Sequence, residues 1–195
     1  MELCRPLPVS AEERSELVRT LPREGNLDVL SRERLQKLAR LAAVLRVHQR
    51  ETAYLIRVID VPQAWTGLFG RTVLLISAPA LDLLTAEELQ ALAAHEAGHE
   101  YYAGEFEHAR ASGDAAALAS IEAACDRIAV LTLQELRIAP SRLSDALLKV
   151  QRFNRLRFGR AWNEGYYPAL EERRRSIAEF SRRSLSPPPP PHVPR

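Results

Sequence analysis

Apolar residues recur every three or four positions along most of this chain, and this is the spacing of one buried face of an α-helix. Ser10 with Glu13, and Thr85 with Glu88, form two patterns typical of capping boxes at helix starts. Ser31 is a further candidate N-cap. The expected helices run from Ser10 towards Leu21, from Ser31 through Leu45, and over about 85–103, 115–137, 142–157 and 169–183.

Two other stretches, residues 54–61 and 72–78, are rich in β-branched and aromatic side chains and are separated by Pro62, Gly67 and Gly70. This composition predicts a pair of β-strands. Together with the helices it indicates an α+β fold, a mainly helical single domain with a small β-sheet. No internal repeat is evident.

Three regions are expected along the chain: an N-terminal helical segment over 1–50, a main domain over 51–184 and a proline-rich tail over 185–195. A chain of 195 residues that is 46% hydrophobic can bury a full core. The run from Pro187 to Pro191 cannot join a helix or a central strand, so a solvated, extended terminus is expected. A ligand for an SH3-type domain is the alternative.

The formal net charge of +2 gives no reason to expect a nucleic-acid partner. No apolar run approaches the ~20 residues of a membrane span, and residues 1–6 lack the apolar core of a secretory signal, so a cytoplasmic protein without a membrane span is expected. Cys4 and Cys125 do not make a disulfide framework. Cys125 is expected to be a small buried residue, with an oxidation sensor as the alternative. The oligomeric state stays open.

Several arginines gather near the C-terminus among glutamates, and this pattern favours the solvated face of a helix. A contact with phosphate or with a membrane surface is the alternative reading. The cluster comprises Arg173, Arg174, Arg175, Arg182 and Arg183.

The chemistry is concentrated in the run His95-Glu96-Ala97-Gly98-His99. On a helix, His95 and His99 project from one face, and Glu96 lies close enough to reach a water held by a metal. Two histidines with this spacing and a carboxylate between them are typical of zinc hydrolases. Gly98 costs a helix about 1 kcal/mol relative to Ala, which favours a close backbone approach there over a tolerated surface glycine. Gly104 is expected to end the helix.

A catalytic zinc ion usually takes three protein ligands, so a third must come from a later element. Glu122 is the candidate, because it lies in a helical stretch with Asp126 one turn further on. An acid at that position can accept the spare ring N–H of a ligand histidine. His108 and Asp114 are the rivals, but the spacing of His108 does not fit the third histidine of metzincins, and a solvated residue is the alternative for it.

These motifs resemble the gluzincin zinc metalloendopeptidases of the HtpX and CAAX-prenyl-protease type, in their small soluble form. The resemblance covers roughly residues 52 to 178. It is carried by Val61-Pro62-Gln63-Ala64-Trp65 with the strand after it, by the lead from Leu81 into Thr85-Ala86-Glu87-Glu88-Leu89, by Glu122-x-x-x-Asp126, and by Tyr167-Pro168 followed by Arg173. Gln63 replaces the usual Asn of the family, and Tyr167 stands where the family commonly has His.

The resemblance implies Zn²⁺ held by His95, His99 and Glu122, with Glu96 as general base and Tyr167 as candidate donor to the oxyanion. The expected activity is hydrolysis of peptide bonds in a peptide or protein substrate. Such a substrate is expected to pair with an edge strand near residues 73–78.

Two readings from other classes stay open. One is a zinc-binding regulatory or interaction protein with a latent or occluded peptidase site. The other is a structural helical protein in which the His-Glu-x-x-His run arose by chance.

Overall fold

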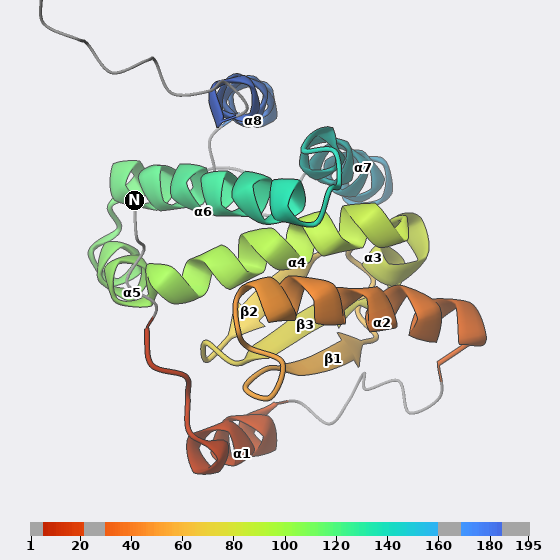
Figure 1. Ribbon diagram of the computed structural model, residues 1–195, viewed down its shortest axis with the longest axis vertical. Coiled ribbons are helices and arrows are strands. Elements are labelled where there is room, and N and C mark those ends of the chain that lie inside the picture. The colour runs from red at the N-terminus through yellow and green to blue at the C-terminus, as the bar shows by residue number, and fades with distance from the viewer. Residues whose placement is uncertain (1–5, 22–29, 160–168, 185–195) are drawn as a thin grey trace, which may run out of the picture.

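The computed structural model describes residues 6–21, 30–159 and 169–184, and within them it is an α+β fold dominated by helices (Figure 1). The fold class expected from the sequence is confirmed. The described elements, in chain order, are α1 (Ala11–Thr20), α2 (Arg32–Val47), β1 (Leu55–Ile59), β2 (Thr66–Phe69), β3 (Val73–Ser77), α3 (Ala78–Leu83), α4 (Ala86–Tyr101), α5 (Ala103–Ser112), α6 (Ala115–Glu135), α7 (Ser141–Phe158) and α8 (Leu170–Ser184).

The three strands form one mixed sheet in the order β1-β3-β2. β3 pairs in parallel with β1 and antiparallel with β2, so the predicted pairing of the first and last strands is confirmed. The short strand β2 was not expected, because its four residues include Gly67 and show no clear alternation. β3 therefore lies in the centre of the sheet. The expectation of a free edge near residues 73–78 is wrong, because a strand paired on both sides has no edge to offer.

α4 is the central helix of the fold and packs against α2, α6, α7 and the strand β2. Its residues from Glu88 to Gly98 are buried on every side, which is the pattern of a helix enclosed by other elements. Leu41, Val44 and Leu45 of α2 belong to the same core cluster as Leu89 and Leu92 of α4. The division at residue 50 stays a prediction.

Both capping boxes are present. At the start of α4, the Thr85 N–H donates to Glu88 Oε2 over 2.8 Å, and the Glu88 N–H donates to Thr85 Oγ1 over 3.3 Å. Gly104 does not end this helix, because α4 ends at Tyr101 and Gly104 lies in the next helix, α5. Apolar spacing gave no signal for α5, since Ala109 is its one buried residue.

No helix within the described ranges is long and apolar enough to cross a bilayer. Tyr167, Cys4 and the proline-rich tail over 185–195 lie outside the described residues.

Candidate metal centre

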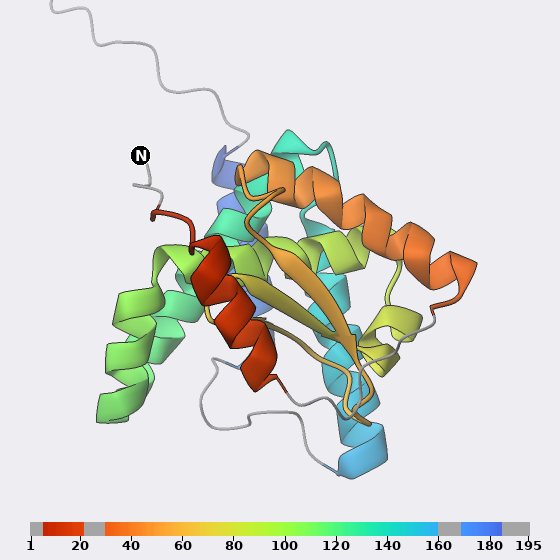
Figure 2. The ribbon, with the colours of Figure 1, turned by 90° about the horizontal axis from the view of Figure 1, so that it is seen from below.

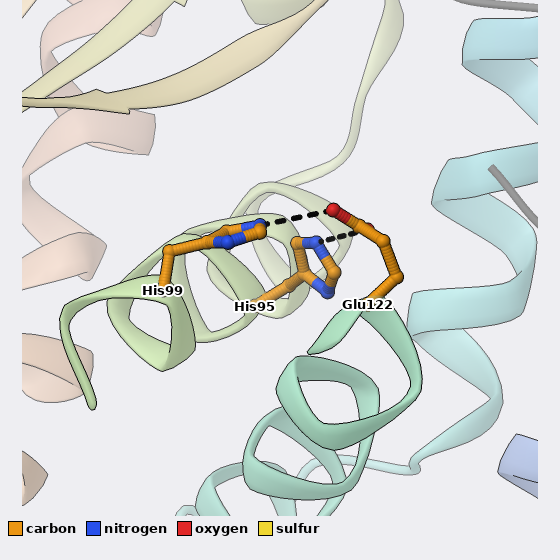
Figure 3. Close-up of side chains that lie close together, drawn as sticks. All are labelled: His95, His99 and Glu122. Atoms are coloured by element: carbon orange, nitrogen blue, oxygen red, sulfur yellow. Dashed lines mark ion pairs between the residues drawn. The ribbon is translucent and has the colours of Figure 1, made fainter. Parts of the chain in front are cut away.

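Three side chains from two helices point toward one another (Figure 3). α4 presents His95 and His99 one turn apart, and α6 presents Glu122 opposite them. The Nε2 atom of His95 lies 3.2 Å from Glu122 Oε2, and that of His99 lies 3.4 Å from Glu122 Oε1. One ligand atom from each residue lies within 4.8 Å of the other two. The arrangement presents two nitrogens and one carboxylate to a common point.

Gly98 allows α6 to approach closely enough for this arrangement. A Cβ atom at Gly98 would lie 2.9 Å from Cys125 Cα and 3.0 Å from Cys125 Cβ. The close backbone approach predicted at this glycine is confirmed. Cys125 is one turn from Glu122 and is fully buried, and burial raises the pKa of its thiol, as suits the small buried residue that the sequence predicted.

Asp126 lies behind His95, one turn beyond Glu122. The Nδ1 atom of His95 is 3.0 Å from Asp126 Oδ1, so the predicted contact between this acid and the spare ring nitrogen is confirmed. A ring that donates from Nδ1 to this carboxylate keeps Nε2 for the centre of the site. Burial acts to raise the pKa of Asp126, but the bond to His95 and the nearby Arg173 lower it to about 2.

Arg173 is a buried part of this site. Its Nε and Nη2 atoms donate to Asp126 over 2.9 and 2.7 Å, a two-pronged contact between guanidinium and carboxylate. Its Nη1 atom lies 3.6 Å from Glu122 Oε2. The reading of the arginine cluster as a solvated face is wrong for Arg173, whereas Arg175 on the same helix is exposed.

The cluster is suited to a cation. Burial by itself lowers the pKa of His95, but Asp126 and Glu122 outweigh burial and raise that pKa to about 10. Burial, followed by the charge of His95, lowers the pKa of His99. Neither oxygen of Glu122, nor Nδ1 of His99, has a hydrogen-bond partner among the residues that the structure describes. A buried carboxylate facing two imidazoles is a ligand set that matches zinc.

Glu96 lies beside the cluster without joining it. The residue is 8% exposed, and its Oε1 atom accepts a hydrogen bond of 2.8 Å from Thr66 Oγ1 of β2. A cleft of about 980 Å³ reaches Glu96, His95 and His99. The site thus has an acid positioned at the cleft, next to the point where the three side chains converge.

The loop before β2 is held by Asn154 of α7, which also lines the cleft. The amide of this buried side chain accepts from the Ala64 N–H over 2.9 Å and donates to the Ala64 carbonyl over 2.8 Å. Sequence reasoning missed both Asn154 and Thr66, because a single polar residue in a helix or a short strand carries no spacing signal. The Tyr-Pro-to-Arg spacing had drawn attention to Arg173 without assigning it a partner.

The rival ligands lie away from the cluster. His108 is exposed on α5, and Asp114 caps α6 by accepting the Ala117 N–H over 2.9 Å. Both are therefore excluded from this group. Tyr167 lies outside the described residues, so its role stays a prediction.

Two helices that present histidines and a carboxylate to one buried point, with a further acid at an open cleft, define a candidate metallohydrolase. The sequence model of peptidase family M48 matches residues 30–125, which include His95, His99 and Glu122. This match confirms the resemblance to metallopeptidases of the HtpX and CAAX-prenyl-protease type. The family supports a peptidase, and its members are metallopeptidases. No curated protein matches the chain.

Proposed function

We propose that this protein is a zinc-dependent metalloendopeptidase. The observation that carries the proposal is the convergence of His95, His99 and Glu122 with Glu96 alongside them at the cleft. The first three residues would hold the zinc ion, and Asp126 would orient His95 through its Nδ1 atom. The match of residues 30–125 to the model of peptidase family M48 supports the same reading.

Zinc, when bound, supplies Lewis acidity that polarises the scissile carbonyl and lowers the pKa of water towards about 7. Glu96 takes the proton from the attacking water and delivers it to the leaving amine. Thr66 holds one oxygen of that carboxylate, which leaves the other to face the reacting atoms. Arg173 keeps Asp126 ionised behind His95, so the ring is held in one orientation.

The substrate is proposed to bind along β2, and this replaces the earlier expectation for residues 73–78. β2 has one partner, β3, and forms an edge of the described sheet. The Ser77 N–H donates to the Trp65 carbonyl, and Gly67 stands opposite Leu75. Since partners alternate along an antiparallel pair, the backbone groups of Thr66 and Leu68 point to the free edge. A peptide strand can pair there beside Glu96.

Tyr167 is proposed as the donor to the developing oxyanion. The basis is its place in the sequence, where the family commonly has His before the same proline. Tyr167→Phe should lower kcat by roughly 10² to 10³ with little change in KM. An unchanged kcat would assign the donor role to another group.

Zinc content and turnover of matched variants test the proposal. Protein purified without added metal should carry one zinc per chain by elemental analysis, and His95→Ala, His99→Ala or Glu122→Ala should lose it. His108→Ala is the matched control, because this histidine is exposed and remote from the cluster. Glu122→Ala with wild-type zinc content would refute the ligand assignment.

The role of Glu96 is tested separately. Glu96→Gln keeps the shape of the side chain and the bond from Thr66, so zinc should be retained. Cleavage of an unstructured protein substrate should fall by at least about 100-fold, because the general base is gone. Cleavage that survives, once contaminating proteases are excluded, would disprove the mechanism.

A second candidate is a metal-binding protein with a latent peptidase site. The observation that favours it is the N-terminal helix α1, which contributes residues to the wall of the cleft. In that case the purified chain would bind zinc and leave unstructured substrates intact.

A further inference from the structure

The N-terminal stretch, residues 6–20, contributes to the lining of the cleft and is attached to the rest of the protein by few contacts. None of the ten residues of α1, all of them described, is buried. In Figure 2, seen from below, α1 lies in front of the strands and α4 lies behind them. A helix without buried residues contributes little to the stability of the fold, and it can move away at a low free-energy cost.

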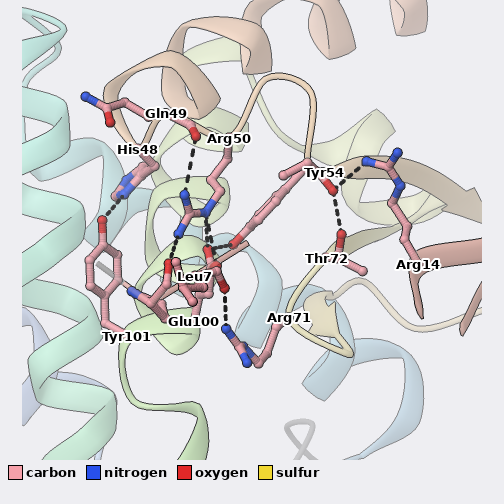
Figure 4. A network of polar contacts seen from close by, with 12 residues as sticks. Leu7, Arg14, His48, Gln49, Arg50, Tyr54, Arg71, Thr72, Glu100 and Tyr101 are labelled. Carbon is pink, nitrogen blue, oxygen red and sulfur yellow. Dashed lines mark hydrogen bonds and ion pairs between the residues drawn. The ribbon is translucent and has the colours of Figure 1, made fainter. Parts of the chain in front are cut away.

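Arginine side chains provide most of this attachment, through backbone carbonyls (Figure 4). Arg50 Nη2 donates to the Pro6 carbonyl over 2.6 Å, and Arg71 Nη2 donates to the Leu7 carbonyl over 2.8 Å. Arg14 of α1 donates to the Ala53 carbonyl over 2.9 Å. These contacts resemble the capture of an extended peptide more than the packing of a core.

Detachment would leave no buried charge without a partner. The Nε atom of Arg50 is 2.9 Å from Glu100 Oε2, and Tyr54 donates to the same oxygen. This buried ion pair belongs to the body of the protein and persists without the N-terminal stretch. Arg71 lacks a full set of hydrogen bonds even when the stretch is attached, because its buried Nε has no acceptor in the described parts of the chain.

The same stretch limits the cleft. Val9, Glu13, Glu16 and Leu17 contribute to its lining, as do residues 66–68 of β2. Leu17 Cδ1 lies 2.5 Å from the position that a Cβ atom on Gly70 would take. Leu17 therefore fills the space just beyond the last residue of β2. Gly70 is two residues beyond Leu68, about 6–7 Å along an extended chain, so a peptide that paired with Thr66 and Leu68 and continued towards Gly70 would approach Leu17.

We propose that residues 6–20 form a detachable end wall of the substrate cleft, which admits short peptides and excludes long chains until it moves away. This inference rests on the proposed peptidase function, but the effect of the wall is on the affinity for peptides and can be measured without cleavage. α1 then determines the length of substrate that the site accepts.

Leu17→Glu tests the end wall, because it places a charge against Gly70 and loosens α1. The variant is made in the Glu96→Gln background, so that binding is measured without cleavage. Two fluorescent peptides share one central sequence, one of about five residues and one of about twenty, the shorter matching a strand that ends within β2. Fluorescence anisotropy then gives the affinity for each.

Leu17→Glu should tighten binding of the long peptide by about fivefold or more, as relief of a steric overlap does, and leave the short peptide unchanged. Ser15→Glu is the matched control, because it adds the same charge on the opposite, exposed face of α1 and should behave like its parent. An unchanged ratio of the two affinities, or weaker binding of both peptides, would overturn the proposal.

Hydrogen exchange verifies the state of α1 in each variant. Exchange over residues 11–20 should accelerate in Leu17→Glu, while protection of α4 stays as in the control. If α4 also loses protection in Leu17→Glu, the test is repeated with Arg14→Ala. This variant removes the hydrogen bonds to the Thr52 and Ala53 carbonyls, and Arg14 does not line the cleft. Turnover with Glu96 intact is a separate measurement: failure to cleave either peptide would end the peptidase proposal and leave the binding comparison valid.

Discussion

Gly98→Ala changes the closest contact between the two helices that carry the proposed ligands. The added methyl would lie 2.9 Å from Cys125 Cα, a backbone atom that cannot rotate out of the way. Overpacking of this kind costs about 1–3 kcal/mol, and the better helix propensity of alanine returns about 1 kcal/mol. The free energy of unfolding should therefore fall by about 0–2 kcal/mol relative to wild type.

Gly104→Ala isolates the steric part of this effect. Gly104 also lies in a helix, and nothing stands within 4 Å of the position of its Cβ. Gly104→Ala should gain from the higher helix propensity of alanine without any steric clash. Gly98→Ala and Gly104→Ala should therefore differ by about 1–3 kcal/mol in unfolding free energy. That difference corresponds to roughly 2–4 °C in Tm for each kcal/mol in a chain of this size.

Denaturant and thermal unfolding of the metal-free protein measure this difference, and zinc titration of both variants follows. Gly98→Ala should bind zinc more weakly, because moving α6 away shifts Glu122 from His95 and His99. Adding Cys125→Ala should restore little, since the closest atom is Cα and not the sulfur. Equal stability and equal zinc affinity for Gly98→Ala and Gly104→Ala would refute the reasoning.

Three further predictions concern single side chains. Thr66→Val removes the hydrogen bond to the proposed general base and should lower kcat by about tenfold with zinc retained, and wild-type kcat would contradict the positioning role. Arg173→Met removes the guanidinium that donates two hydrogen bonds to the buried Asp126 carboxylate and should cost about 3–5 kcal/mol in chemical unfolding, whereas exposed Arg175→Met should change little. Burial acts to raise the pKa of Glu88, but its contacts with Lys149 and the N-cap lower it below 4.5. The ionised form thus adds stability above about pH 4.5 that is lost as the pH falls through the lowered pKa, and Glu88→Gln should flatten this acid limb of a stability–pH curve.

Local sequence signals identified much of the fold. Helix starts at Ser10 and Thr85 were predicted because a capping box is complete within four residues. Short or weakly patterned elements were missed. β2 has four residues and a glycine, and α5 buries a single alanine, so neither shows the periodicity on which such predictions depend. The order of the strands could not be predicted for the same reason, because β2, which the sequence did not reveal, forms one edge of the sheet.

The proposed site divides in the same way. The sequence by itself determined that His95 and His99 share a helix face, because the helix repeat fixes their spacing. The poor helix propensity of a mid-helix glycine indicated the close approach at Gly98. The Glu122/Asp126 pattern indicated which acid could complete the group.

The tertiary structure alone decided what lies around these residues. The crossing of α4 and α6 brings Glu122 to the two histidines, and the return of α8 buries Arg173 against Asp126 across 47 positions of sequence. The position of β2 brings Thr66 into hydrogen-bond contact with Glu96, and α1 contributes residues to the lining of the cleft. These contacts join residues far apart in the chain, so they depend on packing between elements, for which local spacing carries no signal.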